Sequence, residues 1–329
     1  MARSNDGTQE ETTAGRHAQK PSELPGKGWK AILKRVKSEI KNDHLSLLAA
    51  GVAFKALLAL FPALVAAISI WGLVASPQQI TRQVEGFTNA LPSGAGELLS
   101  NQMRNIAGSE PGTLSTALAI SIALALWSAS GGMAGLMEGC TAAYDEIETR
   151  KFPIKRGIAI LLTLGAIVFL LITIGLIAVL PAMLDTLGLG SAATLAVQIV
   201  QWPLLAALFV GVLAVLYKYA PDRDQPQLRW VSWGAGIATV LWLLGSAVFT
   251  LYVNNFGKFG ETYGSFAGII VLMLWLFLTA FVVLLGAEIN AEMERQTAED
   301  TTTGEPRPMG ERGAAPADTT PEQFDAPRR

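Results

Sequence analysis

Charged residues are scarce in this sequence. Only 16% of its 329 residues are Asp, Glu, Lys or Arg, whereas a soluble globular domain usually carries about 25%. The charges concentrate at the two ends and in a few short internal segments, and long apolar runs lie between them. This pattern argues against a soluble domain. The net charge of −2 gives no reason to expect a nucleic acid as partner.

Cysteine and histidine are also rare. The single cysteine, Cys140, excludes an intramolecular disulfide framework. His17 and His44 both precede the first apolar run, which excludes a histidine-based metal site inside the membrane. We therefore predict no metal and no cofactor.

Sequence signals for an enzyme are missing as well. The chain has no phosphate-binding P-loop and no G-x-S-x-G nucleophile elbow. The one dense acidic group, Asp145, Glu146 and Glu148, stands beside Arg150 and Lys151, so local ion pairing accounts for it. We therefore expect that the protein is not an enzyme.

The apolar runs are long enough to cross a membrane. A bilayer core about 30 Å thick needs roughly 20 apolar residues in a helix, and the helix is required because lipid cannot satisfy open backbone groups. The sequence therefore predicts an all-α, polytopic membrane protein with about six transmembrane helices in a domain over residues 45–292. The expected spans are about 45–75, 114–138, 157–183, 193–219, 229–253 and 266–288.

Basic residues alternate between the connections. They are frequent before the first span and in the second and fourth connections, and they are sparse in the first, third and fifth. Because positive flanks stay inside, we expect both termini in the cytoplasm and the protein in the cell (inner or cytoplasmic) membrane. The polar segments 1–26 and 293–329 are expected to be disordered cytoplasmic tails.

Two further helical pieces are predicted outside the spans. Residues 27–44 place apolar side chains on one face and basic ones on the other, which is typical of a juxtamembrane amphipathic helix on the inner leaflet. Anionic lipid headgroups are its expected contacts, through Lys30, Lys34, Arg35, Lys37 and Lys41. A topology signal alone would explain the same basic residues. The long connection 76–113 is expected to form a short outer helical cap, either structural or gating.

Several stretches resemble one family. They are AAGVAFKALLALFP at 49–62, LWSASGG at 126–132, LYKYAPDR at 216–223, YGS at 263–265, LWL at 274–276 and LGAEINAE at 285–292. Together they are similar to the YihY/virulence factor BrkB family over roughly residues 30–295. The resemblance implies an inner-membrane protein and says little about activity. Members were long labelled as a ribonuclease, a label regarded as a misassignment, and some are linked to serum resistance or to lipid transfer in the envelope.

Lys55 is the charge inside a span that most needs an explanation. It lies about ten residues into the first span, and holding a charge there costs about 2.5–3.5 kcal/mol. Three arrangements would offset this cost. Lys55 can snorkel toward the headgroups, pair with Glu138 or Glu288, or face a water-filled cavity that binds an anionic headgroup.

Other polar residues in the spans are candidates for a substrate path. Gln198 and Gln201 share one face of the fourth span, where hydrogen bonds between helices are the simpler account. Glu288 and Asn290 end the last span. Pro62 predicts a kink in the first span. Small residues at four-residue spacing predict close helix packing, at Gly131, Gly135, Gly139, Gly264 and Gly268.

Two functions of different kinds fit these features. The polar residues inside the spans favour a transporter or a translocator of lipids or other envelope components, with membrane lipids as partners and a lipid or small molecule as substrate. The basic helix and tails favour a non-transporting membrane scaffold or envelope-maintenance factor. The glycine stripes would pack equally well within one chain or between chains, so the sequence leaves the oligomeric state open.

Overall fold

A computed structural model describes residues 14–72, 116–179, 191–256 and 266–324. The chain divides into two compact units. Unit 1 comprises Met1–Ala53, Gly135–Ile154 and Gln198–Arg329, and unit 2 comprises Phe54–Ala134 and Lys155–Val197. Within the described ranges the elements are helices, and the β-structure is an isolated bridge between Pro226 and Thr302. The expected outer cap over 76–113 lies outside the described ranges.

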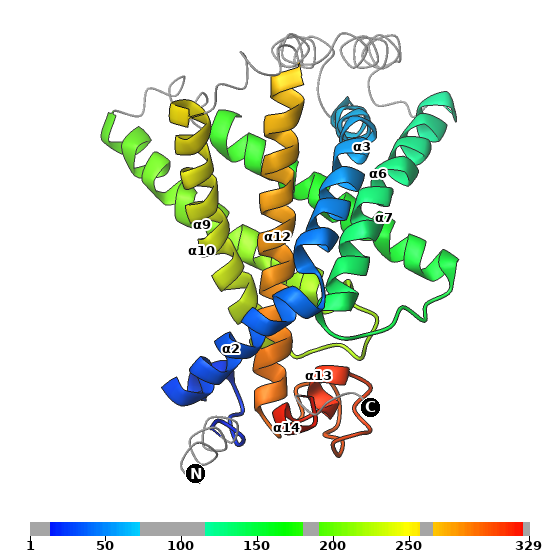
Figure 1. Cartoon of the computed structure of the whole chain (residues 1–329). Coiled ribbons are helices and arrows are strands. Elements are labelled where there is room, and N and C mark those ends of the chain that lie inside the picture. The colour runs from blue at the N-terminus through cyan, green and yellow to red at the C-terminus, as the bar shows by residue number, and fades with distance from the viewer. Residues whose placement is uncertain (1–13, 73–115, 180–190, 257–265, 325–329) are drawn as a thin grey trace. The chain divides into compact units, whose positions relative to one another are not determined.

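Six long helices correspond to the expected spans. They are α3 (Leu45–Gly72), α6 (Thr116–Ala143), α7 (Phe152–Ile174), α9 (Ser191–Tyr219), α10 (Leu228–Phe256) and α12 (Ala267–Gln296). Figure 1 shows them as the longest ribbons. α7 continues as the short π-helix η2 (Gly175–Val179).

Length and hydropathy select candidate spans among these helices. Four stretches of the described residues qualify, namely Phe152–Ile177, Ile199–Tyr219, Leu228–Asn255 and Ala267–Gln296. A fifth is added if α2 (Gly26–Asn42) and the first part of α3 count as one bent span. Side chains such as Leu161 on α7 and Leu244 on α10 are exposed, as expected where lipid covers the helix. The chain is an all-α polytopic membrane protein, with four to five candidate spans in its described part.

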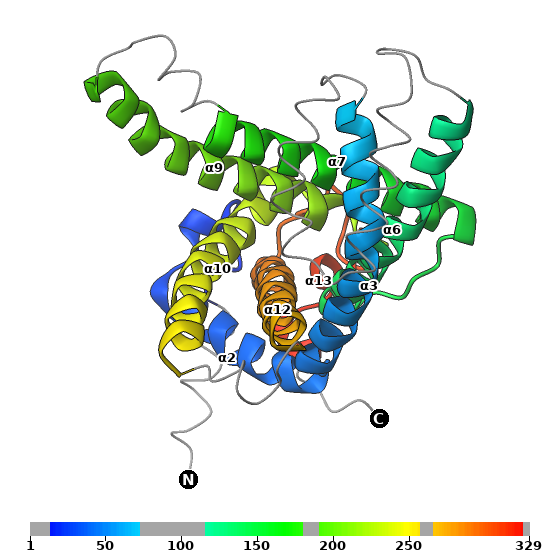
Figure 2. The same ribbon diagram turned by 90° about the horizontal axis from the view of Figure 1, so that it is seen from above.

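The α10–α12 pair forms the centre of unit 1, with the two helices side by side in Figure 2. The Asn290 side chain accepts a hydrogen bond from the Gly234 N–H at 2.9 Å and donates one to the Val231 carbonyl at 3.4 Å. A Cβ atom added to Gly234 would lie 2.5 Å from the Gly286 carbonyl oxygen, and one added to Gly286 would lie 2.7 Å from the Ala238 Cβ. Glycine at both positions therefore permits the close approach of the two backbones.

Helix α2 packs its apolar face on protein. Ile32 and Val36 are buried in a cluster that includes Trp230 of α10 and Met293 of α12, and the Trp29 and Trp233 rings lie 6.1 Å apart. The opposite face is exposed and carries Lys30, Lys34, Lys37 and Lys41. The apolar face of α2 therefore packs on other helices, and its basic face is exposed. The sequence had suggested that the apolar face enters the lipid.

The terminal segments differ from the expected disordered tails. Residues 297–324, including α13 (Ala315–Asp318) and α14 (Pro321–Phe324), follow a defined path beside the end of α12. The buried Arg312 guanidinium explains part of this order, because it donates hydrogen bonds to the carbonyls of Ala298, Glu299, Arg307 and Ala317. At the other terminus, the Arg16 carbonyl accepts a hydrogen bond from the Ala298 N–H at 2.8 Å.

Asp222 joins two connections of unit 1. Its Oδ2 accepts hydrogen bonds from the Thr149 N–H, from the Thr149 hydroxyl at 2.7 Å, and from the Arg150 N–H at 3.1 Å. Although partial burial opposes it, the hydrogen bonds from Thr149 and the charge of Arg150 lower the pKa of Asp222. The carboxylate therefore stabilises this junction when ionised, and the stabilisation is lost as pH falls through its lowered pKa.

Unit 2 packs through small residues and one arginine. A Cβ atom on Gly132 would lie 3.0 Å from the Ala59 Cβ, so α6 approaches α3 closely at this residue. The Arg156 guanidinium lies 4.3 Å from the centre of the Trp127 ring and donates to the Trp127 carbonyl. Ala125 and Ile167 form a small buried contact between α6 and α7.

The α10–α12 contact can be tested with two glycines on the same helix. We expect Gly234→Ala to lower the free energy of unfolding by about 1–3 kcal/mol, because the added methyl group would overlap Asn290 and the Gly286 carbonyl. Gly236→Ala is the matched control, since nothing lies within 4 Å of its added Cβ. Melting temperatures of the detergent-solubilised proteins report the difference, and equal values for both variants would contradict this packing.

Candidate functional site at the end of α12

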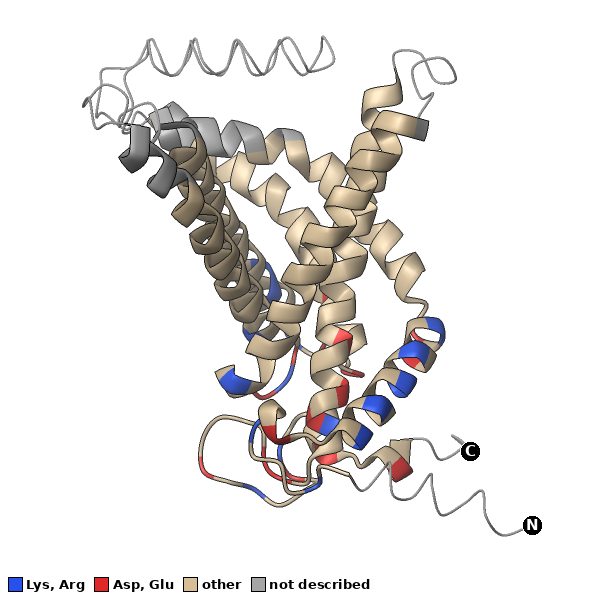
Figure 3. Cartoon of the chain, turned by 90° about the vertical axis from the view of Figure 1, so that its left-hand side faces the viewer, with Lys and Arg blue, Asp and Glu red and all other residues tan. Residues whose placement is uncertain are grey.

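The last turns of α12 are polar and buried. Glu288, Asn290, Glu292, Glu294, Arg295 and Gln296 are each 0% exposed. Charged residues of unit 1 gather there, on α2 and on the segment after α12 (Figure 3). Because an unpaired buried charge costs several kcal/mol, the partners of these side chains decide whether the arrangement is structural or functional.

Two arginines share the Glu292 carboxylate. Arg35 of α2 contacts one of its oxygens and Arg295 contacts the other. Arg35 also donates to Gln296 Oε1 at 2.7 Å, and Arg295 donates to Asp145 Oδ2 at 2.7 Å. These contacts connect α2, the α6–α7 connection and α12 around one carboxylate.

The position of Arg35 differs from its expected contact with lipid headgroups. Its side chain is 7% exposed and points to Glu292 instead of outward. The basic face of α2 that remains exposed carries Lys30, Lys34, Lys37 and Lys41, and Lys27 in the first turn of the helix is exposed as well. Sequence spacing placed Arg35 among them because the helical periodicity does not show where an acidic partner lies.

A second ion pair involves Glu294, two residues further along α12. Arg223 binds Glu294 at 2.7 Å with both side chains fully buried, and the Thr301 hydroxyl donates to the same carboxylate at 2.7 Å. The Tyr144 ring lies 4.9 Å from the Arg223 guanidinium. Burial, reinforced by the Glu294 charge, raises the pKa of Tyr144 well above its usual value, so Tyr144 stays neutral there.

Glu288 is the exception in this cluster. Both of its carboxylate oxygens are buried, and neither has a hydrogen-bond partner among the described residues. The acidic groups of Glu292, Asp43 and Asp145 act on it unfavourably, while Arg295 acts favourably. Glu288 is therefore a buried carboxyl group whose surroundings do not provide the contacts that its neighbours have.

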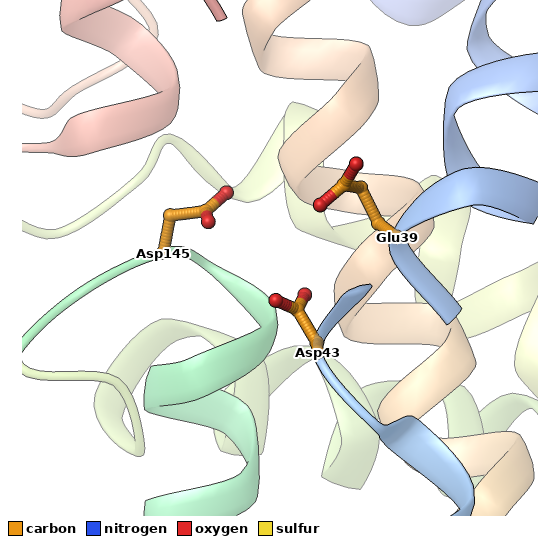
Figure 4. Close-up of side chains that lie close together, drawn as sticks. All are labelled: Glu39, Asp43 and Asp145. Atoms are coloured by element: carbon orange, nitrogen blue, oxygen red, sulfur yellow. The ribbon is translucent and has the colours of Figure 1, made fainter. Parts of the chain in front are cut away.

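Three further carboxylates meet beside α2. Glu39 and Asp43, at the end of α2, and Asp145, after α6, each place one oxygen within 4.8 Å of the others. Figure 4 shows the three side chains directed toward one another. Asp145 has φ of 55°, a left-handed conformation that Asp tolerates better than most residues. Burial raises the pKa of Glu39, with further contributions from the Asp145 and Glu292 charges.

The other predicted path residues are dispersed. Asn290 clamps α12 to α10, as described above. Gln201 of α9 is 7% exposed, and its Oε1 has no hydrogen-bond partner among the described residues. The Gln198 side chain lies outside the described ones. Glu138 on α6 belongs to unit 1 and is exposed, and Lys55 on α3 belongs to unit 2 and is exposed, so the pairing of Lys55 with either glutamate stays a prediction.

The predicted packing residues also occupy different environments. Gly139 meets Leu284 of α12, since its added Cβ would lie 2.8 Å from that side chain. Gly135 is buried, whereas Gly131 and Gly268 have nothing within 4 Å of an added Cβ. Pro62 lies inside α3, and Gly264 lies outside the described residues. Gly139 therefore makes a close contact, Gly131 and Gly268 do not, and close packing stays a prediction for Gly135 and Gly264. The close contacts at Gly132, Gly234 and Gly286 were not predicted.

Most members of the charged cluster were also missed from the sequence. Glu39 and Asp43 are four residues apart, and Glu292 and Arg295 are three apart, so each pair shares one side of a helix. This spacing was the available signal. Nothing local in the sequence connects either pair to Asp145, Arg223 or Arg35.

Long apolar helices with a buried charged cluster at the end of one span define a helical multi-pass membrane protein. The chain belongs to the virulence factor BrkB family, which it matches over residues 36–310. The match confirms the resemblance seen in the sequence motifs. The matched range includes the charged cluster except for Arg35, which immediately precedes it.

Individual relatives agree with this assignment. The chain is 32% identical over 253 residues to a Bacillus subtilis protein named ribonuclease-like protein YfkH, covering 75% of this chain and 89% of the relative. A UPF0761 membrane protein of Aeromonas salmonicida is 26% identical over 271 residues, which cover 80% of this chain and 90% of the relative. A UPF0761 membrane protein of Tolumonas auensis is 38% identical over 88 residues, 26% of this chain and 28% of the relative. No solved structure matches.

The role of Arg35 can be separated from that of its basic neighbours. We expect Arg35→Met to lower the free energy of unfolding by about 3 kcal/mol, because Glu292 loses one partner in a buried ion pair. Lys34→Met removes an exposed charge from the same helix and should leave stability nearly unchanged. Thermal unfolding in detergent measures both, and a neutral Arg35→Met would show that Arg35 is not part of the cluster.

Proposed function

We propose that this protein is a transporter that moves a lipid or another envelope component through the membrane, with Glu288 on the path. The observation that carries the proposal is the Glu288 carboxyl group, which is buried in a candidate span with no hydrogen-bond partner for either oxygen among the described residues. Ionisable residues in such positions commonly line substrate, ion or proton pathways.

The stability of the fold does not explain why a carboxyl group is buried at Glu288. Glu292 and Glu294, on the same helix, are held by arginines, whereas neither oxygen of Glu288 has a hydrogen-bond partner among the described residues. A buried charge that lacks such contacts destabilises the fold by several kcal/mol. A group that gains and loses a proton, a cation or a substrate during a transport cycle explains why glutamate is retained there.

A lipid substrate is supported by the exposed face of α2. Lys30, Lys34, Lys37 and Lys41 face outward from a helix whose other face packs on α12. Each would attract an anionic headgroup by about 1 kcal/mol. The four lysines would thus gather anionic lipids beside the helix that carries Glu288. Gln201 on α9, in the same unit as Glu288, is a further polar group for the path.

The proposed orientation has both termini in the cytoplasm of a cell whose inner membrane holds the protein. It rests on the basic flanks, and it places α2 and the charged end of α12 at the inner leaflet. We expect a single cysteine at Thr303→Cys to react with an impermeant maleimide only after cells are opened, and one at Ser109→Cys to react in intact cells. Cys140 is buried, so it should contribute little labelling. The reverse pattern would overturn the orientation.

Transport itself can be measured in vesicles. We expect purified protein to speed the transbilayer movement of fluorescent phosphatidylglycerol, measured by dithionite quenching, at least tenfold over protein-free vesicles. Glu288→Gln should remove most of this gain. The control Glu311→Gln changes an exposed acidic residue and should not alter the rate.

The alternative is a non-transporting scaffold, and one observation favours it. Residues 297–324 form an ordered layer beside the end of α12, which offers a surface for other proteins. Absence of movement over a broad panel of labelled lipids and solutes would favour this alternative. The name of the Bacillus relative also suggests a ribonuclease. We do not propose that activity for this chain, and RNA cleavage by the purified protein that Glu288→Gln abolishes would replace the transport proposal.

A further inference from the structure

The carboxylates of Glu39, Asp43 and Asp145 converge at the junction of three segments. Glu39 and Asp43 lie four residues apart on α2, and Asp145 follows α6 (Figure 4). One oxygen from each side chain lies within 4.8 Å of the other two. All of these residues belong to unit 1. Bringing three acidic groups this close is unfavourable unless something positive lies between or beside them.

A second feature points to a ligand at the same place. The Glu288 carboxyl group is 0% exposed, and neither oxygen has a hydrogen-bond partner among the described residues. Its charge interacts with those of Asp43 and Asp145. A buried acidic group that interacts electrostatically with two members of the trio would be stabilised by a cation that the trio holds.

Two arginines supply positive charge close to this trio. Arg295 binds Asp145 and Glu292, and Arg35 binds Glu292. The Asn42 side chain donates a hydrogen bond to Glu39 at 2.9 Å. A divalent cation held by the trio would add positive charge between the three carboxylates themselves.

We infer that Glu39, Asp43 and Asp145 form a binding site for a hard divalent cation, with Glu288 beside it. The donor atoms are all carboxylate oxygens, which suit Ca²⁺, Mg²⁺ or Mn²⁺ and do not suit soft metals. An upper limit of 4.8 Å between the three oxygens is compatible with their binding one such ion. Mg²⁺ demands near-ideal octahedral geometry and loses its water reluctantly, so we expect a site made of protein carboxylates to prefer Ca²⁺ and Mn²⁺.

Such a site would have a structural consequence. The bound cation would join the end of α2 to the connection after α6 and would lie against α12 through Glu288. These segments are distant in the sequence, and the cation would add to the ion pairs of Arg35 and Arg295 and to the apolar contacts between α2 and α12. The inference does not depend on transport, because binding can be measured on the protein at rest.

Binding of Mn²⁺ to the purified full-length protein at pH 7 tests the site directly, with the free ion counted by electron paramagnetic resonance. We expect saturable binding of one Mn²⁺ per chain, competed by Ca²⁺ more effectively than by Mg²⁺. Asp43→Asn and Glu39→Gln should each weaken binding roughly tenfold to 100-fold, by analogy with lost ligand-shell contacts. The control Glu311→Gln should bind as the unaltered protein does.

A spin label locates the ion without altering any ligand. A nitroxide at Lys41→Cys lies on α2 between Glu39 and Asp43, and one at Leu251→Cys lies about 27 Å along α10 from Trp233, near which α2 packs. We expect Mn²⁺ to broaden the first signal strongly and the second weakly. This measurement decides the matter if the carboxylate variants fail to fold.

Three results would overturn the site. They are no saturable binding, binding that neither carboxylate substitution weakens in folded protein, and equal broadening at the two labels. Thermal stability that rises on acidification, in protein that binds no Mn²⁺, would show that shared protons take the place of the cation. A positive binding result together with no lipid movement would support the metal site and contradict the proposed transport.

Discussion

The buried end of α12 imposes the main constraint on unit 1. An apolar helix that continues into Glu292, Glu294 and Arg295 without reaching solvent needs a partner for each of these charges. Those partners come from α2, from the connection between α6 and α7, from the connection between α9 and α10, and from the segment after α12. Many contacts that hold unit 1 together therefore serve to neutralise one stretch of helix.

This constraint also explains why α2 has two kinds of basic residue. Arg35 faces Glu292 and Gln296, and its planar guanidinium contacts both. The four lysines face outward. Arginine is better suited to a buried pair and lysine to a hydrated surface, so the sequence of α2 already distinguishes its two faces by residue type.

The sequence predicted the parts of the fold that depend on local properties. Long apolar runs predicted the helices, and periodicity predicted α2 nearly to its ends. Burial of the C-terminal segment was not predicted, because its order depends on Arg312 finding four carbonyls from distant turns. The glycine contacts were missed for a similar reason. Spacing within one helix does not reveal that Gly234 faces Gly286 on another.

The candidate site shows the same division. Glu288 and Asn290 were both predicted as polar residues at the end of a span and as candidates for a substrate path. In the structure Asn290 is fully engaged with α10, whereas Glu288 is not engaged at all by hydrogen bonds from described residues. The two residues are two positions apart, so at about 100° per residue their side chains leave the helix in directions about 200° apart and meet different neighbours.

The order of synthesis adds a consequence. Arg295 contacts Thr319 and the Phe324 ring. Arg312 donates hydrogen bonds to the Ala298 and Ala317 carbonyls and so links the two ends of the segment between α12 and α14. These partners leave the ribosome after α12 has been made. The helix must therefore enter the membrane with part of its charged end still unsatisfied, and the last stage of folding begins only when the C-terminal segment has been released.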